Sequence, residues 1–167
     1  MTDTFKRDLK EGKRIEYEIL DLIKKDYPDA YVIEGYCKEW DIFIPSIGEG
    51  VEVKSDKMSQ RTGNIVIEKS FNGKPSALST TKASIWVFHT GKKIILTSPD
   101  ILRLIIKDHN QRLVTFTAKG DTKSKEAYLV KQYLIEKTAN KVTKASDATI
   151  NRYVILNDLS IIEFARL

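Results

Sequence analysis

The chain has 167 residues and a mass of 19.1 kDa, with 41% hydrophobic and 31% charged positions. This length suits one compact domain and is short for two ordinary ones. No stretch approaches the roughly 20 consecutive apolar residues of a membrane-spanning helix, and the first residues lack the apolar centre of a signal peptide, so we expect a cytoplasmic protein. One cysteine, Cys37, and two histidines, His89 and His109, exclude an internal disulfide and a zinc site built from cysteine and histidine.

The net charge is +5 and the pI is near 9.1, values that are compatible with a polyanionic partner without requiring one. Residues 53–93 carry eight basic side chains against two acidic ones, Asp56 and Glu68. A second basic stretch, residues 119–144, has seven lysines and three acidic residues. Such stretches are typical either of a solvated surface or of a surface that contacts phosphates, and charge alone does not separate the two.

The first predicted element is an amphipathic helix within residues 11–28. Ile15, Ile19 and Ile23 recur at the spacing of one helix face, and Tyr27-Pro28 discourages continuation. Short runs rich in β-forming residues then predict four strands. They lie at residues 30–33, 40–44, 51–54 and 64–68.

Two strongly apolar runs, residues 85–88 and 94–96, predict interior strands on either side of a turn. Ser98-Pro99-Asp100 is typical of a helix start, and we expect that helix to continue to about residue 108. The weaker pattern beyond residue 109 predicts, in order, a strand at 112–117, a helix at 126–138 and apolar stretches at 153–156 and 161–164. With no repeat and no linker, the sequence predicts one α/β or α+β domain, a mixed sheet with helices packed against it.

Three charged residues stand out on the strands at 40–44 and 51–54. A side-chain period of two puts Trp40, Ile42 and Ile44 on one face and Asp41 on the other. The same period separates the two valines of Val51-Glu52-Val53-Lys54 from Glu52 and Lys54. The connecting loop is short enough for antiparallel pairing, which would bring Asp41 and Glu52 within range of one divalent ion.

Asp41 followed by Glu52-Val53-Lys54 resembles the signature of the PD-(D/E)XK nuclease superfamily, in which an Asp and a (D/E)XK pair sit on a hairpin after a helix with a further glutamate. Gly12-Lys13-Arg14-Ile15-Glu16 is similar to the G-x-x-x-E entry to the first helix of Holliday-junction resolvases and related endonucleases, with Glu16 as the helix glutamate. The resemblance spans residues 10–97, and Glu39-Trp40 replaces the proline before the Asp. It implies an α/β restriction-endonuclease-like core, a central mixed β-sheet flanked by helices.

The resemblance implies a metal-dependent DNA endonuclease that hydrolyses phosphodiester bonds with Mg²⁺, for which Mn²⁺ substitutes. Asp41 and Glu52 would supply hard oxygen ligands, and the Val53 carbonyl and Glu16 would add others. Lys54 would orient or deprotonate the attacking water and balance charge on the phosphate. DNA is then the expected partner, and five basic residues are candidates for contacting its phosphates. They are Lys57, Arg61, Lys69, Lys74 and Lys82.

Each candidate has a structural alternative. Asp41 taken singly could be an exposed strand residue, and Glu52 with Lys54 a solvent-facing stripe. Glu16 could pair with Lys13 on the helix surface. Beyond these four, Glu68 could line the same cleft, although an outward direction is favoured for it. Gln60 is a weak candidate for contacting the phosphate or the water, and a core role is favoured for Trp86 and Phe88.

Two further function classes stay open on the sequence. One is a nucleic-acid binding module with a nuclease-like fold and no catalysis, and the other is an assembly protein whose basic stretches meet acidic partners. The sequence does not distinguish branched or junction DNA from other substrates, because no base-reading motif is present. Cutting of paired strands would favour a two-fold homodimer.

Overall fold

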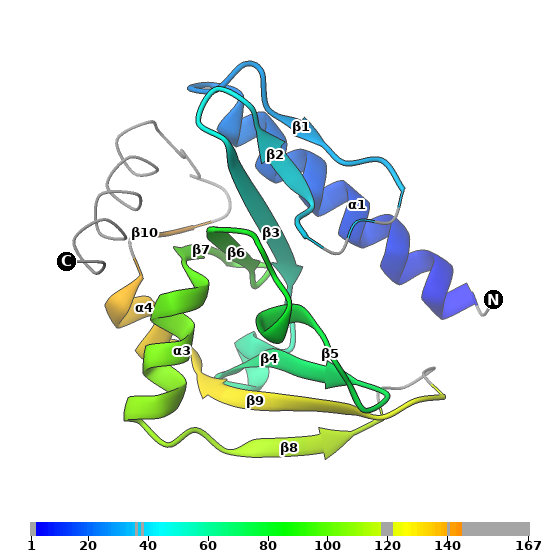
Figure 1. Cartoon of the computed structure of the whole chain (residues 1–167), viewed down its shortest axis with the longest axis vertical. Coiled ribbons are helices and arrows are strands. Elements are labelled where there is room, and N and C mark those ends of the chain that lie inside the picture. The colour runs from blue at the N-terminus through cyan, green and yellow to red at the C-terminus, as the bar shows by residue number, and fades with distance from the viewer. Residues whose placement is uncertain (1–2, 36, 38, 118–121, 140, 145–167) are drawn as a thin grey trace.

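The computed structural model describes residues 3–35, 37, 39–117, 122–139 and 141–144. Within these residues one sheet is six-stranded and mixed, in the order β1-β2-β3-β6-β7-β10, with β3 and β6 parallel and the other neighbours antiparallel (Figure 1). Its strands are β1 Tyr31–Val32, β2 Ile42–Ile44, β3 Glu49–Ser55, β6 Ile85–His89, β7 Lys93–Thr97 and β10 Lys141–Lys144. This arrangement confirms the expected mixed α/β class.

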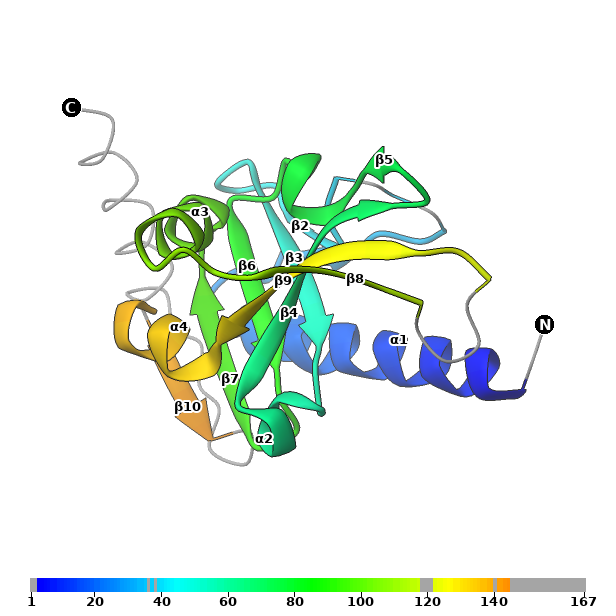
Figure 2. The same ribbon diagram turned by 90° about the horizontal axis from the view of Figure 1, so that it is seen from below.

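The described residues also form a second sheet, which is four-stranded and antiparallel, in the order β5-β4-β9-β8. Its strands are β5 Lys74–Pro75, β4 Asn64–Phe71, β9 Lys125–Lys131 and β8 Leu113–Phe116. The helical segments are α1 Asp3–Ile23, α2 Ser59–Thr62, the 3-10 turn η1 Ala77–Ser79, α3 Pro99–Asp108 and α4 Gln132–Thr138. Figure 2 shows α1 apart from α3 and α4, with the strands between them.

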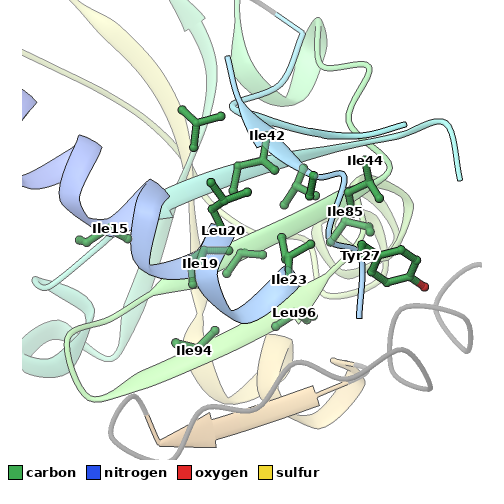
Figure 3. Close-up of a cluster of buried hydrophobic side chains, with 14 residues drawn as sticks. Ile15, Ile19, Leu20, Ile23, Tyr27, Ile42, Ile44, Ile85, Ile94 and Leu96 are labelled. Carbon is green, nitrogen blue, oxygen red and sulfur yellow. The ribbon is translucent and has the colours of Figure 1, made fainter. Parts of the chain in front are cut away.

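Helix α1 covers one face of the first sheet with an apolar stripe. Figure 3 shows Ile15, Ile19, Leu20 and Ile23 of this helix among side chains of β2, β6 and β7. All four are at most 5% exposed. Burying a large aliphatic side chain stabilises a fold by about 1.5–3 kcal/mol, so this stripe anchors α1 across the β2–β3 hairpin.

The opposite face of the first sheet packs against the second sheet, α3 and α4. Trp86 and Phe88 of β6 lie there in one buried cluster with Ile65 and Ile67 of β4 and with side chains of α3 and α4. Ile85 and Val87 of β6 belong to the cluster beneath α1. Strand β6 is therefore buried on both faces, which explains why its sequence is continuously apolar rather than alternating.

The two predicted helices, at residues 11–28 and after residue 98, agree with the structure to different degrees. Helix α3 begins as expected, because the Ser98 hydroxyl accepts a hydrogen bond from the Ile101 N–H at 3.2 Å. Helix α1 begins at Asp3, eight residues before the predicted segment, and ends at Ile23. Residues 7–10 of this added segment are all exposed, Leu9 among them at 56%, so these residues show no apolar periodicity that would extend the predicted helix.

Two predictions about local structure are wrong. Residues 125–131 form strand β9 between β4 and β8, and only 132–138 of the predicted helix 126–138 is helical. A short apolar run fits either element, and pairing on both edges decides for the strand. Trp40 leaves the face of Ile42 and Ile44 and stacks on Phe43 at 5.3 Å between ring centroids, because β2 begins only at Ile42.

The other predicted strands agree with the observed ones to within a few residues, whereas β5 and β10 were not predicted. The apolar stretches at 153–156 and 161–164 lie outside the described residues. In the part of the chain that the structure describes, no helix is long and apolar enough to cross a membrane.

Candidate active site

Asp41 immediately precedes β2, at the end of the β2–β3 hairpin where β3 extends beyond its partner strand. Ile42 pairs with Val51, and the Asp41 N–H donates to the Val51 carbonyl at 2.9 Å. Two residues further along β3, beyond the end of the partner strand, the Asp41 carboxylate accepts the Val53 N–H at 2.7 Å through Oδ2. The half-buried Asp41 side chain thus continues the ladder that the backbone of β2 leaves unfinished.

This position of Asp41 also defines the surroundings of the Val53 carbonyl. Along a strand, the N–H and C=O of one residue point to the same edge, and the edge alternates from residue to residue. Because the Val53 N–H faces Asp41, its carbonyl faces the same open edge of β3. One carboxylate and one backbone oxygen therefore lie at the point where the hairpin strands separate.

Glu52 and Lys54 lie on the face of β3 opposite to Val51 and Val53, as the alternation predicts. In the parallel pairing with β6, Glu52 is opposite Trp86 and Lys54 is opposite Phe88, so both charged side chains share the face that the second sheet covers. The Lys54 ammonium contacts the Glu52 carboxylate and lies 5.6 Å from the centre of the Trp86 ring. The Glu52 side chain is 13% exposed and that of Lys54 is 36% exposed.

Glu16 approaches from α1, which covers the other face of β3. Its side chain is only 15% exposed and accepts a hydrogen bond from the Lys13 ammonium at 2.7 Å. Lys13 also donates to the Ile33 carbonyl at 3.3 Å, which links α1 to the segment after β1. The pairing with Lys13 that was weighed from the sequence is present, and it does not turn Glu16 out to solvent.

The charges of these side chains act on one another. Burial raises the pKa of Glu52 above its usual range against the opposing charge of Lys54, and the carboxylates of Asp41 and Glu16 raise it further. Burial likewise raises the pKa of Glu16, with Asp41 adding to the effect and Lys13 opposing it. For Lys54, burial lowers the pKa, but the charge and hydrogen bond of Glu52 outweigh burial and keep the ammonium protonated. Partly desolvated acids that repel one another are a common feature of cation-binding and catalytic sites.

A groove runs past this site between β3 and the second sheet. One hollow, of about 460 Å³, is lined by Glu52 and Lys54 together with residues of β4, β5 and the segment after β5. An adjoining hollow, of about 390 Å³, is lined by Lys54, Trp86 and residues of β4, β8 and β9. Glu68 lines both hollows, so the outward direction favoured for it is wrong. It accepts a hydrogen bond from the Ser76 hydroxyl at 2.6 Å and lies 3.7 Å from the Lys125 ammonium.

The five basic residues expected to contact phosphates do not form one surface. Lys74 lines the groove beside Glu52 and Lys54. Lys57 pairs with Glu11 of α1 at 2.6 Å, and Lys82 pairs with Glu39. Arg61 is exposed on α2 and Lys69 is half-buried on β4.

Lys125 lines the groove as well, and the sequence drew attention to it only as one of seven lysines in the second basic stretch. A more specific local signal was available for the β4–β5 hairpin. Asn72-Gly73 is typical of a two-residue turn, and both residues have the positive φ that this turn requires, 51° and 73°. Such a turn predicts that Phe71 and Lys74 face each other, as they do.

Other residues considered from the sequence lie away from the groove or in the core. The Gln60 side-chain amide donates to the Thr90 carbonyl, so Gln60 contacts the turn between β6 and β7. His89 is 4% exposed and lies 3.4 Å from Glu18, whereas His109 is exposed at the end of α3. Trp86 and Phe88 are at most 1% exposed, which confirms their assignment to the core.

The donor set at the edge of β3 fits a hard divalent ion. Mg²⁺ in proteins usually takes one or two carboxylates and keeps several waters, and Asp41, Glu52 and the Val53 carbonyl provide such a set. No group of three His, Cys, Asp or Glu side chains gathers into a ready-made metal cage within the described ranges. Each acid of the site accepts a hydrogen bond through one oxygen. Asp41 accepts it from the Val53 N–H, Glu52 from Lys54 and Glu16 from Lys13.

The same arrangement gives the site both kinds of group that phosphodiester hydrolysis requires. Carboxylates at a strand edge can hold a cation, and the adjacent Lys54 can donate to an oxygen that gains negative charge. Comparisons of the chain with protein-family models, with curated proteins and with solved structures found no match.

Proposed function

We propose that the protein is a divalent-metal-dependent DNA endonuclease with a PD-(D/E)XK-type active site. One observation carries the proposal. The Asp41 carboxylate is hydrogen-bonded to the backbone of β3 between Glu52 and Lys54, the two charged residues of the Glu-x-Lys motif. A chance Glu-x-Lys match on a charged strand would not account for an aspartate fixed at this position by its own carboxylate.

The order of elements supports the same proposal. Helix α1 with Glu16 comes first, the β2–β3 hairpin with Asp41 and Glu52 follows, and β6 then lies parallel to β3. A helix with a glutamate followed by a strand hairpin is the arrangement that the sequence resemblance implies. We extend the proposal to the fold and infer a restriction-endonuclease-like core in the first sheet.

In the proposed mechanism, Asp41, Glu52 and the Val53 carbonyl would hold Mg²⁺ or Mn²⁺, and Glu16 would contribute from α1 directly or through water. A bound ion at this place lowers the pKa of an attacking water and neutralises charge on the phosphate. Lys54 is protonated beside Glu52 and donates to that water or to a phosphate oxygen as negative charge develops. Lys74 and Lys125 contact the phosphates of the DNA strand that lies in the groove.

The test combines metal binding with cleavage, because a metal ligand and a positioning lysine fail differently. Asp41→Asn keeps an oxygen that can accept the Val53 N–H, so we expect it to fold like the wild type while losing Mn²⁺ affinity and cleavage together. Lys54→Ala should keep Mn²⁺ binding and lose cleavage by roughly 10²-fold or more. Titration calorimetry with Mn²⁺ and single-turnover cleavage of labelled duplex, flap, junction and single-stranded DNA measure these two properties.

The matched control is Glu136→Gln. The Glu136 side chain is partly buried, like those of Glu52 and Glu16. It pairs with Lys93 at 2.8 Å and does not line the groove. It should leave cleavage unchanged. Cleavage that persists in excess EDTA, or that survives in Asp41→Asn, would contradict the proposal. DNA binding without any cleavage by the wild type would favour the non-catalytic binding module instead.

A further inference from the structure

Lysine and phenylalanine side chains alternate in a row across the second sheet. Lys74 of β5 is opposite Phe71 of β4, Phe71 is opposite Lys125 of β9, and Lys125 is opposite Phe116 of β8. Residues directly opposite each other in antiparallel strands lie on the same face of the sheet. The row Lys74-Phe71-Lys125-Phe116 therefore extends across all strands of this sheet on one face.

This row borders the groove of the candidate active site. Lys74 and Phe71 line the hollow that contains Glu52 and Lys54. Lys125 and Phe116 line the adjoining hollow, which also contains Lys54. A chain lying along the row would thus pass directly beside the proposed catalytic lysine.

The core does not require the two phenylalanines. The opposite face of β4 and β9 supplies Ile65, Ile67 and Val130, each 0% exposed, to the second core cluster. Phe71 is 36% exposed, and Phe116 is half-buried outside either core cluster. The Lys125 ammonium lies 5.5 Å from the centre of the Phe71 ring, so cation and ring are already held together.

Accessible aromatic rings that alternate with lysines suit an unpaired nucleic-acid strand. Bases stack on aromatic side chains while their phosphates contact the cations, and every base offers a ring face for such stacking. In a duplex, both faces of each base are already covered by neighbouring bases. Each hollow also lies in the range of about 300–1,000 Å³ that is typical of small-molecule sites, which suits single nucleotides.

We propose that the second sheet binds an unpaired stretch of DNA, with bases stacked on Phe71 and Phe116 and phosphates contacting Lys74 and Lys125. This inference rests on the proposed function for its DNA partner. It adds a substrate class, namely DNA with a single-stranded segment that leads into the site of Glu52 and Lys54. Blunt duplex lacks the unpaired bases and is a weaker ligand.

The experiment measures binding separately from cleavage. Fluorescence anisotropy in EDTA compares a labelled single-stranded thymidine oligonucleotide with a blunt duplex of the same length. Phe71→Leu and Phe116→Leu keep apolar volume but remove the stacking ring, and each should weaken single-strand binding by about tenfold with little change for the duplex. Leu113→Ala is the matched control, because Leu113 is 40% exposed on the same strand as Phe116 but three pairs away and on the other face.

Two further variants complete the design. Phe71→Trp should restore single-strand binding, and Lys74→Gln should reduce the salt dependence of that binding by about one unit of slope. Wild-type single-strand affinity in both leucine variants, or equal losses for single strand and duplex, would overturn the proposal. Single-strand binding that depends on the phenylalanines, without any cleavage, would support the binding role of the second sheet and contradict the proposed endonuclease activity. Cleavage that depends on neither ring would support the endonuclease activity and contradict the binding role.

Discussion

Gly50 of β3 lies directly beneath the ring of Trp40, the residue that precedes Asp41 in the chain. A methyl group added at position 50 would lie 2.6 Å from Cδ2 and Cε3 of Trp40 and 2.8 Å from its Cγ. Carbon atoms are not found this close without a bond, so either the ring or the strand must move. Trp40 is also stacked on Phe43, which limits the directions in which the ring can shift.

Gly50→Ala should therefore destabilise the protein by overpacking. Introducing a methyl group into filled space costs about 1–3 kcal/mol, and a chain of this size loses about 2–4 °C in Tm per kcal/mol. Replacing glycine in a strand recovers about 0.5–1 kcal/mol through backbone entropy, which is smaller than the clash. With mid-range values the net cost is about 1.3 kcal/mol, so we expect Tm to fall by about 3–5 °C, together with weaker cleavage as Trp40 displaces Asp41.

The assay is thermal unfolding of Gly50→Ala, Trp40→Leu and the double variant. If the ring is the obstacle, Trp40→Leu makes room for the new methyl group, and the double variant should be more stable than the sum of the single effects predicts. The coupling should lie in the range of about 0.5–3 kcal/mol that is observed for contacting residues. A Gly50→Ala protein as stable as the wild type, or strictly additive effects, would refute the stacking of Trp40 over Gly50.

Three other outcomes follow from the site and the fold. DNA cleavage should require Mg²⁺ or Mn²⁺, whereas Ca²⁺ should support binding with little turnover, and gel assays with each ion after EDTA treatment check this. DNA binding should weaken steeply between about 50 and 200 mM salt, and an affinity that is indifferent to salt would contradict a phosphate-contacting surface. Ser98→Ala should cost about 1 kcal/mol in denaturant unfolding through loss of the α3 cap, and an unchanged midpoint would contradict that role.

Local patterns were sufficient for the hairpin that carries the candidate site. Glu52 and Lys54 lie on β3, and Asp41 immediately precedes β2, which a short turn joins to β3. The pairing of the two strands and the face of Glu52 and Lys54 follow from the period of two. The same reasoning placed Trp40 wrongly, because alternation holds only inside a strand and β2 starts at Ile42. Where an element begins is decided by its partners.

The second sheet could not be predicted from local patterns. Strand β9 pairs with β4 across about 60 residues of sequence, and that long-range pairing converts a segment with helical periodicity into a strand. Glu68 and Lys125 face the groove for the same reason, since the sheet that directs them is assembled from distant segments. The groove is therefore a property of the tertiary pairing rather than of any one motif.

The acids at the edge of β3 make a stability prediction that is independent of cleavage. The pKa values of Glu52 and Glu16 are raised, mainly by burial and also by the charge of Asp41. A carboxyl group whose pKa is raised by folding favours its protonated form, so its contribution to stability increases as pH falls through the folded pKa. Above its folded pKa each group is charged, and the folded state then carries the full cost.

Glu52→Gln and Glu16→Gln should therefore raise Tm at pH 7, because a neutral amide keeps the shape of the side chain and removes the buried charge.

For the control, Glu136→Gln, the sign of the change in Tm is opposite. Burial raises the pKa of Glu136, but hydrogen bonds from Gln132 and Lys93 outweigh burial and lower it, so its stabilising charge is present at pH 7 and is lost only as pH falls through that lowered pKa. Calorimetric Tm values at pH 7 and pH 5 test the set: the gain in the two site variants should be smaller at the lower pH, because acids with a raised pKa take up protons earlier as pH falls. Mg²⁺ should raise the wild-type Tm and raise that of Glu52→Gln less, because the ion neutralises the same charge. A lower Tm in both site variants would show that Glu16 and Glu52 serve the fold as ion-pair partners of Lys13 and Lys54 and do not form a strained cation site.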